Sequence, residues 1–581
     1  MLLSLSFCAD AAGADASAVE RALTVKVSGV EGEQLATVRN ALTIVSYEQQ
    51  ADIGEARLQR LLDQVPAQVL EAMQRFGYYR AQARVSQRQD AEQRPLIEIQ
   101  VERGEPVRVT SRRLKISGAA ARNARIMRSL DAFAPAEGAV FNHRSYEASK
   151  AIVERALRRR GYFDQELVTA QVEIKRHSNS AEMALHWRSG TRYFMGELRF
   201  EGAQFDEPLM RRFVTWPAGA RYDQRRIEAL QQSLAASGWF AGIEVIPETE
   251  RASNLHVPIL VRLRPGKRTG LSAGLSYETD VGAGVRTGVE RRWMNRHGHA
   301  LASEVSVAQK VSDISLDYRI PRGRRAADQY LLGARYRDEN TAVVNAQSIR
   351  YSAGLTIGRD LWSGAMSFNL LDGSFLIGSR DAFDPRRSSQ VVYAELNASR
   401  FFSRNRIRPD NGLSLRLTTR AAGDAAGSDV ALLQARGEAR GVVSLREGTR
   451  FLGRVEIGAT HTNQFRELPP ELRFFAGGDQ SVRGYAYQSL GERDAFGEPI
   501  GGRFLSTFSA ELEQRFRPGF SVAVFFDGGD VFSHGRPKLH FGTGVGLRWA
   551  SPVGPIRVDL GHGLGNPDSS VQLHISAGPD L

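Results

Sequence analysis

The chain has 581 residues, which is too long for one ordinary hydrophobic core and indicates several domains. Lysine and arginine exceed aspartate and glutamate by 12, but charged residues make up only 24% and apolar residues 42%, which excludes a disordered polyelectrolyte. No stretch is apolar over the roughly 18 residues of a spanning helix, whereas a transmembrane β-barrel needs no such stretch. The single cysteine, Cys8, excludes internal disulfides and cysteine-based metal sites.

The first 20 residues resemble the end of a secretory signal peptide. A short apolar run is followed by small-residue A-x-A patterns at Ala12-Gly13-Ala14 and Ala14-Asp15-Ala16. Such patterns precede signal-peptide cleavage sites, although the usual positively charged start is missing. We therefore interpret residues 1–20 as the remnant of a signal peptide that begins further upstream. A plain disordered terminus is the alternative.

Three repeats of about 80 residues follow, at 21–105, 106–191 and 192–267. Each begins with a strand pattern ending at a glycine, continues with helical periodicity to a second glycine followed by two aromatic residues, and finishes with two strands. The glycine closing each repeat lies 27, 29 and 28 residues after the glycine that ends its helix. This constancy predicts three tandem α+β domains of β-α-α-β-β order, each a three-stranded sheet with two helices on one face.

The positions that carry the repeat pattern are Gly29, Gly77, Gly104, Gly118, Gly161, Gly190, Gly202, Gly238 and Gly266. In the third repeat, Ile227, Leu230 and Leu234 mark the buried face of a helix with Asp223 as its N-cap. In the first repeat, Pro66 falls within the helical pattern, and we expect it to split that helix. Open edges of small sheets accept an extended strand from another chain, so the array is typical of a docking arm.

From about position 268 to 581 the pattern changes to period-two alternation. Ile314, Leu316 and Tyr318, for example, alternate with Ser315 and Asp317. One face is apolar and the other carries charge or glycine, as in strands with lipid outside and a polar lumen inside, and a packed sandwich core would not accept such charges. At roughly 10 residues per strand plus turns, the region holds about sixteen strands. The sequence therefore predicts a transmembrane antiparallel β-barrel.

Several segments of this half carry a family resemblance, among them RFFAGGDQSVRGYAYQSLG, FFDGGDVF and GTGVGLRWASPVGPIRVDLGHG. With the three glycine-aromatic repeats, which look like POTRA domains, they resemble the POTRA-barrel superfamily of outer-membrane assembly proteins. Three POTRA units, the first barrel segment and the ending HISAGPDL are most similar to the TamA family, the outer-membrane subunits of translocation and assembly modules. BamA would be expected to carry five POTRA units and two-partner secretion transporters two.

The resemblance implies a pair of interacting motifs. One lies at the tip of a long loop, about 462–502, that folds back into the lumen, and the other lies on the barrel wall. The loop motif comprises Val482, Arg483, Gly484 and Tyr485, and the wall motif comprises Phe525, Asp527 and Gly529. About forty residues rich in glycine and proline separate the flanking strand patterns, and a loop of that length is usually functional or disordered. Arg483 could form a bidentate, charge-assisted pair with Asp527; a solvated loop arginine is the alternative.

The resemblance also implies a function: an insertase that helps β-barrel proteins such as autotransporters fold into, or cross, the bacterial outer membrane, without a cofactor, metal or catalytic residue. Its POTRA arm would lie in the periplasm and bind a TamB-like, inner-membrane-anchored partner. Because an unpaired strand in lipid leaves its backbone polar groups unsatisfied, a seam that opens between the first and last barrel strands would offer a pairing edge. The expected seam residues are Leu271, Leu275, Val571, Leu573, Ile575 and Gly578, of which the last would let the strand end kink inward.

Other functions receive less support. A passive outer-membrane secretion channel or pore fits the polar lumen, but a loop filling that lumen would plug it. The segment Gly270–Gly274 matches the nucleophile pattern G-x-S-x-G, yet Ser272 lies within a strand pattern that no helix follows. His297 and His299 lack a third metal ligand. Only the net charge would favour nucleic acid, and without a binding motif we expect that charge to meet anionic lipid or the periplasmic partner.

Overall fold

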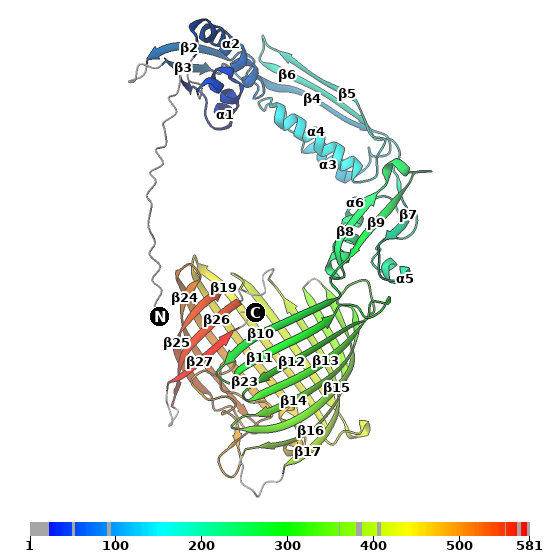
Figure 1. Cartoon of the computed structure of the whole chain (residues 1–581), viewed down its shortest axis with the longest axis vertical. Coiled ribbons are helices and arrows are strands. Elements are labelled where there is room, and N and C mark those ends of the chain that lie inside the picture. The colour runs from blue at the N-terminus through cyan, green and yellow to red at the C-terminus, as the bar shows by residue number, and fades with distance from the viewer. Residues whose placement is uncertain are drawn as a thin grey trace, which may run out of the picture. The chain divides into compact units, whose positions relative to one another are not determined.

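Figure 1 shows the computed structural model of the chain. The described residues are 23–48, 53–89, 95–359, 361–378, 386–403, 408–551, 554–565 and 571–577. The expected signal-peptide remnant at 1–20 lies outside them. The chain forms two compact units: the first contains two repeats and part of the third, and the second contains the rest of the third repeat and the β-rich region. None of the described helices is long and apolar enough to cross a membrane.

The first repeat has the predicted β-α-α-β-β order. Its elements are β1 (Thr24–Ser28), α1 (Gly32–Ala41), the short η1 (Thr43–Tyr47), α2 (Glu55–Gln74), β2 (Gln82–Gln89) and β3 (Pro95–Glu102). The sheet order is β1-β3-β2, with β1 parallel and β2 antiparallel to the central β3. Ile97 and Ile99 of β3 are fully buried against Val65 and Val69 of α2 in one apolar cluster, so the helices cover one face of the sheet.

The second and third repeats have the same topology. The second contains β4 (Arg108–Ser117), α3 (Ala124–Asp131), α4 (His143–Arg158), β5 (Glu166–Lys175) and β6 (Ser180–Arg188) in the sheet order β4-β6-β5. The third contains β7 (Phe194–Glu201), α5 (Glu207–Arg211), α6 (Gln224–Ala236), β8 (Phe240–Pro247), η2 (Thr249–Arg251) and β9 (His256–Pro265) in the order β7-β9-β8. The predicted α+β domains are therefore confirmed.

Local signals explain most of these elements. The glycines at the helix ends, Gly77, Gly161 and Gly238, have φ values of 90°, 83° and 69°, a left-handed conformation that favours glycine. The expected split at Pro66 was wrong, because α2 runs through it without interruption. One backbone hydrogen bond is lost at the proline, but Val65 beside it is fully buried, and burial of the apolar face offsets that loss.

The second half forms one 16-stranded antiparallel sheet whose neighbours follow chain order, which confirms the predicted barrel-type fold (Figure 1). Its strands are β10 (Thr269–Glu278), β11 (Gly282–Arg291), β12 (Ala300–Ala308), β13 (Val311–Pro321), β14 (Gln329–Asn340), β15 (Val344–Arg359), β16 (Trp362–Ile377), β17 (Arg387–Phe401), β18 (Gly412–Ala422), β19 (Leu432–Arg446), β20 (Thr449–His461), β23 (Phe504–Arg517), β24 (Phe520–Phe532), β25 (His540–Ser551), β26 (Gly554–Leu564) and β27 (Gln572–Ala577). A short η3 (Asp424–Ala426) follows β18.

The two faces of this sheet differ chemically. Ile314 and Leu316 of β13 remain about half exposed on the outer face, as lipid-facing residues do. On the inner face, the Asp313 carboxylate accepts hydrogen bonds from Arg335 and Arg337 at 3.0 and 3.3 Å. Charged groups of opposite sign therefore satisfy one another in the lumen.

A long connection, residues 462–502, joins β20 to β23 and folds into this lumen. It contains η4 (Phe465–Glu467), η5 (Pro470–Leu472), β21 (Glu492–Arg493) and β22 (Pro499–Gly501). Leu468 and Leu472 are buried against Leu371, Val391 and Tyr393 of the barrel wall. Because both ends of the loop are packed against strands, its tip is held at a defined place on the inner wall. We call residues 462–502 the inward loop.

Candidate functional site

The tip of the inward loop carries Arg483, and the structure places its guanidinium against Asp527 of β24. Nε donates to one carboxylate oxygen at 2.7 Å and Nη2 donates to the other at 2.9 Å, which is a bidentate pair. The Arg483 Cζ also lies 3.5 Å from the ring centroid of Phe525, the residue two positions before Asp527. Asp527 is fully buried and Arg483 is 7% exposed. The contact implied by the family resemblance is therefore present.

Two further carboxylates and a second arginine complete a buried network. Arg483 Nη1 donates to Glu511 of β23 and to Asp559 of β26, both at 2.9 Å. Arg548 of β25 donates to Glu511 at 2.9 Å and forms an ion pair with Asp559. Burial would lower the pKa of the Arg483 guanidinium, but its hydrogen bonds to Asp527 and the surrounding carboxylates outweigh burial and raise that pKa. We call these five side chains the loop-tip network.

The other motif residues shape the contact around this network. Gly484 has a φ of 91°, and a Cβ there would lie 2.5 Å from the carbonyl carbon of His562 in β26, so only glycine fits. The Tyr485 hydroxyl donates to the Leu564 carbonyl at 3.0 Å, and Val482 is fully buried. Gly529 makes no such contact: it pairs with Thr507 in the neighbouring strand, where a Cβ would meet the Thr507 methyl at 2.7 Å.

A second buried cluster joins three segments near the seam: the turn between β10 and β11, the inward loop and the last strand. His574 Nδ1 lies 2.7 Å from an Asp479 oxygen, and the Asp479 N–H donates to Asp280 at 2.9 Å. The other Asp479 carboxylate oxygen is buried and has no hydrogen-bond partner among the described residues. We call Asp280, Asp479 and His574 the seam clasp. No local sequence pattern marks this cluster.

The seam clasp has the residue types of a metal site, and its ligand atoms lie within 4.8 Å of one another. The hydrogen bonds argue against a metal, however. Because His574 Nε2 accepts the Gly484 N–H at 3.0 Å, the ring proton must lie on Nδ1, where it is donated to Asp479. Neither nitrogen then has a lone pair for an ion. Burial and the charge of Asp479 raise the pKa of Asp280, in the turn, to about 7.

The first and last strands meet along a seam that no backbone ladder closes in the described residues. Their recorded link is one hydrogen bond, from the Ile575 N–H to the Thr279 hydroxyl at 3.0 Å. The first strand, β10, has 10 residues, all paired to β11 on one side. On its other side, the described part of the chain gives β10 no backbone partner.

The predicted seam residues that the structure describes lie in or beside the two strands that border the seam. Leu271 and Leu275 of β10 are 79% and 88% exposed. In the last strand, Leu573 is about half exposed and Ile575 is half-buried; Val571 lies one residue before β27. Gly578, expected to kink the strand end, lies outside the described residues.

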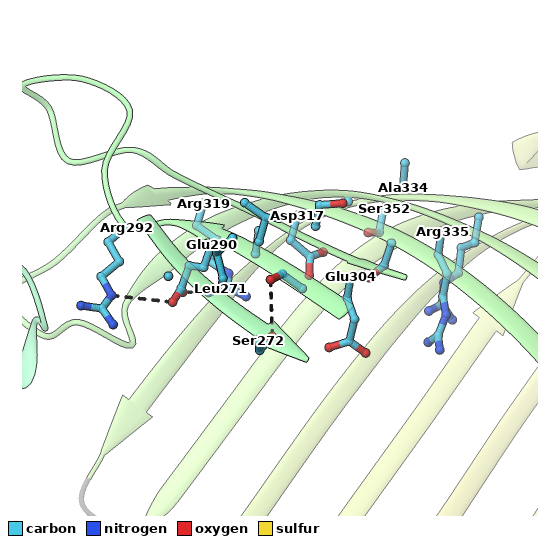
Figure 2. Close-up of a pocket in the computed structure, with 18 residues that line it drawn as sticks. Leu271, Ser272, Glu290, Arg292, Glu304, Asp317, Arg319, Ala334, Arg335 and Ser352 are labelled. Carbon is cyan, nitrogen blue, oxygen red and sulfur yellow. Dashed lines mark hydrogen bonds and ion pairs between the residues drawn. The ribbon is translucent and has the colours of Figure 1, made fainter. Parts of the chain in front are cut away.

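The structure also places the serine and the two histidines that the sequence offered as alternative chemical sites. Ser272 lies in the middle of β10 and its hydroxyl donates to the Gly288 carbonyl at 3.5 Å; a second strand, not a helix, follows (Figure 2). It lines a polar hollow of about 520 Å³ on the lumen side, into which side chains of both charges point from neighbouring strands: Glu290, Glu304, Asp317, Arg319 and Arg335. His297 contacts Asp206 at 3.1 Å, whereas His299 hydrogen-bonds Tyr318 at 2.7 Å, so the two histidines serve different partners.

The fold combines sixteen antiparallel strands that have an apolar outer face, a loop anchored inside the lumen and preceding α+β repeats. These features define an outer-membrane β-barrel with POTRA domains, a class involved in protein assembly and translocation. Residues 295–579 match the Omp85 superfamily domain, and residues 24–103 match the POTRA domain TamA domain 1. The chain therefore carries an Omp85 superfamily barrel, and its first repeat is a POTRA domain.

Individual relatives are similar over different shares of the chain. An outer membrane protein assembly factor BamA from Neorickettsia risticii (strain Illinois) is 23% identical over 461 residues, 74% of this chain and 60% of that protein. A BamA from Nitratidesulfovibrio vulgaris is 32% identical over 120 residues, 19% of this chain and 15% of that protein. This chain thus spans less than two thirds of either curated relative. The crystal structure of BamA from Haemophilus ducreyi lacking POTRA domains 1-3 has the same fold, with a TM-score of 0.69 at 17% identity over 81% of this chain and 99% of that chain.

Proposed function

We propose that this protein is a TamA-type insertase of the bacterial outer membrane, which assists the folding and insertion, or secretion, of β-barrel proteins such as autotransporters. The observation that carries the proposal is the seam: β10 and β27 are adjacent, yet one recorded hydrogen bond joins them among the described residues. Omp85 membership of the barrel region and the TamA-type first POTRA domain support it.

An insertase of this kind must supply hydrogen-bond partners for the backbone groups of a strand that enters the lipid. Each unpaired N–H or C=O of an incoming strand costs several kcal/mol in the hydrocarbon core. The free edge of β10 offers 10 residues to which that strand can pair. Insertion then proceeds along the seam by exchange of hydrogen bonds, without a nucleotide.

Two buried contacts regulate this edge in our proposal. The loop-tip network fixes the inward loop to β23 through β26, and the seam clasp connects that loop to the β10–β11 turn and to β27. Opening the seam requires the clasp and the Ile575–Thr279 hydrogen bond to separate. The loop therefore acts as the internal support of the closed seam.

The POTRA arm would face the periplasm and dock the TamB-like partner. We assign docking to the first repeat, because its edge strand β2 is exposed along almost its whole length and can be extended by a partner strand. Deleting residues 21–105 should abolish co-purification of the partner while the barrel still shows heat-modifiable mobility. Retained co-purification by that folded deletion protein would refute this assignment.

Reconstitution tests the function itself. An unfolded autotransporter barrel should become protease-resistant faster in liposomes that contain the wild-type protein than in empty liposomes. The Arg483→Ala protein should lose most of that acceleration, because its inward loop is no longer anchored. If wild type gives no acceleration but makes the same bilayers conductive, a passive channel replaces the insertase.

A further inference from the structure

An arginine lies on the lipid-facing side of β17. Arg400 shares its face with Leu396, which is 49% exposed, and pairs across the sheet with Trp362 of β16. Its Cζ lies 4.8 Å from the Trp362 ring centroid and 4.4 Å from that of Phe402. Its Nε is buried without a hydrogen-bond partner among the described residues. A lipid-facing arginine costs little near the membrane interface and several kcal/mol at the bilayer midplane, so its depth and partner matter.

Other arginine–aromatic pairs mark the same rim of the barrel. Arg322 lies over Tyr330 at 5.7 Å and Arg517 over Phe520 at 4.5 Å. Arg322 follows the fourth strand, β13, Arg517 is the last residue of the twelfth, β23, and Arg400 lies at the end of the eighth, β17. In an antiparallel barrel, the even-numbered strands all end at the rim from which the first strand starts. Aromatic and basic residues gather where a barrel meets the lipid headgroups, so this rim lies at one membrane interface.

Arg400 also stands beside an apolar trough on the outer face of the barrel. Two cross-strand rows form its floor, one passing from Arg400 through Leu415 to Ala439 and the other from Ala398 through Leu417 to Gly437. Small side chains alternate with leucines in these rows and leave about 430 Å³ open. The trough is lined by Trp362, Ala398, Leu415, Gly437, Ala439 and Val455.

We propose that this trough and Arg400 bind one anionic glycerophospholipid, with an acyl chain along the small residues and the phosphate on the guanidinium. A guanidinium offers paired donors that match phosphate oxygens, and the two aromatic rings hold it in place. No carboxylate forms an ion pair with Arg400 within the described ranges, so its charge is available to an anion. The inference goes beyond the proposed insertase and requires only that the barrel lies in a bilayer.

The site is tested by native mass spectrometry of the full chain released from detergent, with dioleoyl-phosphatidylglycerol and dioleoyl-phosphatidylcholine as probes. Wild type should retain one phosphatidylglycerol in preference to phosphatidylcholine. Arg400→Gln should weaken phosphatidylglycerol retention by about 10-fold and remove the preference, because a charge-assisted bond is lost. Arg517→Gln, which changes a rim arginine on an aromatic ring elsewhere in the barrel, should bind like wild type.

A second pair of measurements separates the chain from the headgroup. Ala439→Trp fills the trough without removing the guanidinium, and should weaken phosphatidylglycerol binding by about as much as Arg400→Gln. Soluble glycerol phosphate should not compete, because it lacks the acyl chain. All variants must show the heat-modifiable mobility of a folded barrel. Undiminished lipid retention by folded Arg400→Gln or Ala439→Trp, or full competition by glycerol phosphate, would overturn the proposal.

Discussion

Replacing Arg483 with methionine should release the tip of the inward loop while leaving the barrel folded. The substitution keeps a long apolar side chain but removes the donors to Asp527, Glu511 and Asp559. Arg548 still forms hydrogen-bonded ion pairs with both of the last two carboxylates, so the cost falls mainly on Asp527, which loses its arginine partner. Among the described residues, the Asp527 carboxylate then keeps two hydrogen bonds, one from the Ser509 hydroxyl and one from the backbone N–H of residue 483.

Leaving one member of a buried ion pair without its partner costs about 3–5 kcal/mol. Because Asp527 retains two hydrogen bonds, we take the lower value, about 3 kcal/mol. Each 1.4 kcal/mol is a factor of ten, so the released state of the loop tip should become about 100 times more populated. The sixteen-strand ladder does not depend on this contact and should keep its stability.

Hydrogen exchange of the loop measures this release. The Gly484 N–H, which donates to His574 in the closed state, should exchange about 100 times faster in Arg483→Met. Arg493→Met is the matched control, because Arg493 lies in the same loop but is exposed and donates to the carbonyls of Gly497 and Ser489. Unchanged exchange in folded Arg483→Met, or equal acceleration in the control, would refute the reasoning.

Three further predictions concern the same contacts. The pKa of Asp280 is raised to about 7 from an ordinary value near 4, so the closed clasp holds a proton that the open form releases. The closed clasp is therefore most stable below about pH 4, and its stability falls by up to about 4 kcal/mol as the pH rises through 7. Hydrogen exchange of the loop should accelerate over that pH range in wild type but not in Asp280→Asn. Gly484→Ala should detach the loop tip, since its Cβ would meet His562 at 2.5 Å with φ at 91°, and a protease should then cleave the loop in a folded barrel. Phe525→Leu removes the ring under Arg483 and should weaken loop docking by about 1–2 kcal/mol, seen as a 5- to 30-fold faster Gly484 exchange; no acceleration would show that the ring contributes nothing.

Much of the fold could be predicted because burial imposes local patterns. A lipid-facing strand must alternate apolar and polar residues, as β13 does at Ile314 and Leu316, and a helix ending in a left-handed residue needs a glycine such as Gly161. Pro66 was misjudged because its effect depends on tertiary packing around α2, which a local pattern does not contain.

The site could be predicted only where a motif marked it. Arg483 and Asp527 were found through the family resemblance and lie 44 positions apart. Glu511 and Asp559 were missed, because alternation places them on the polar face but their meeting depends on strand register across the barrel. The contact between Thr279 and Ile575 joins residues 296 positions apart, and nothing local to either residue signals it.

Locking the seam tests the central claim most directly. Thr279→Cys with Ile575→Cys would place a disulfide where the recorded seam hydrogen bond lies, in a Cys8→Ser background. Ala302→Cys with Asp317→Cys, which links the paired strands β12 and β13, is the control. Liposomes containing the oxidised seam variant should insert an autotransporter barrel no faster than empty liposomes, and reduction should restore the wild-type rate, while the control inserts at that rate in both states. Wild-type insertion by the fully oxidised seam variant would contradict the account.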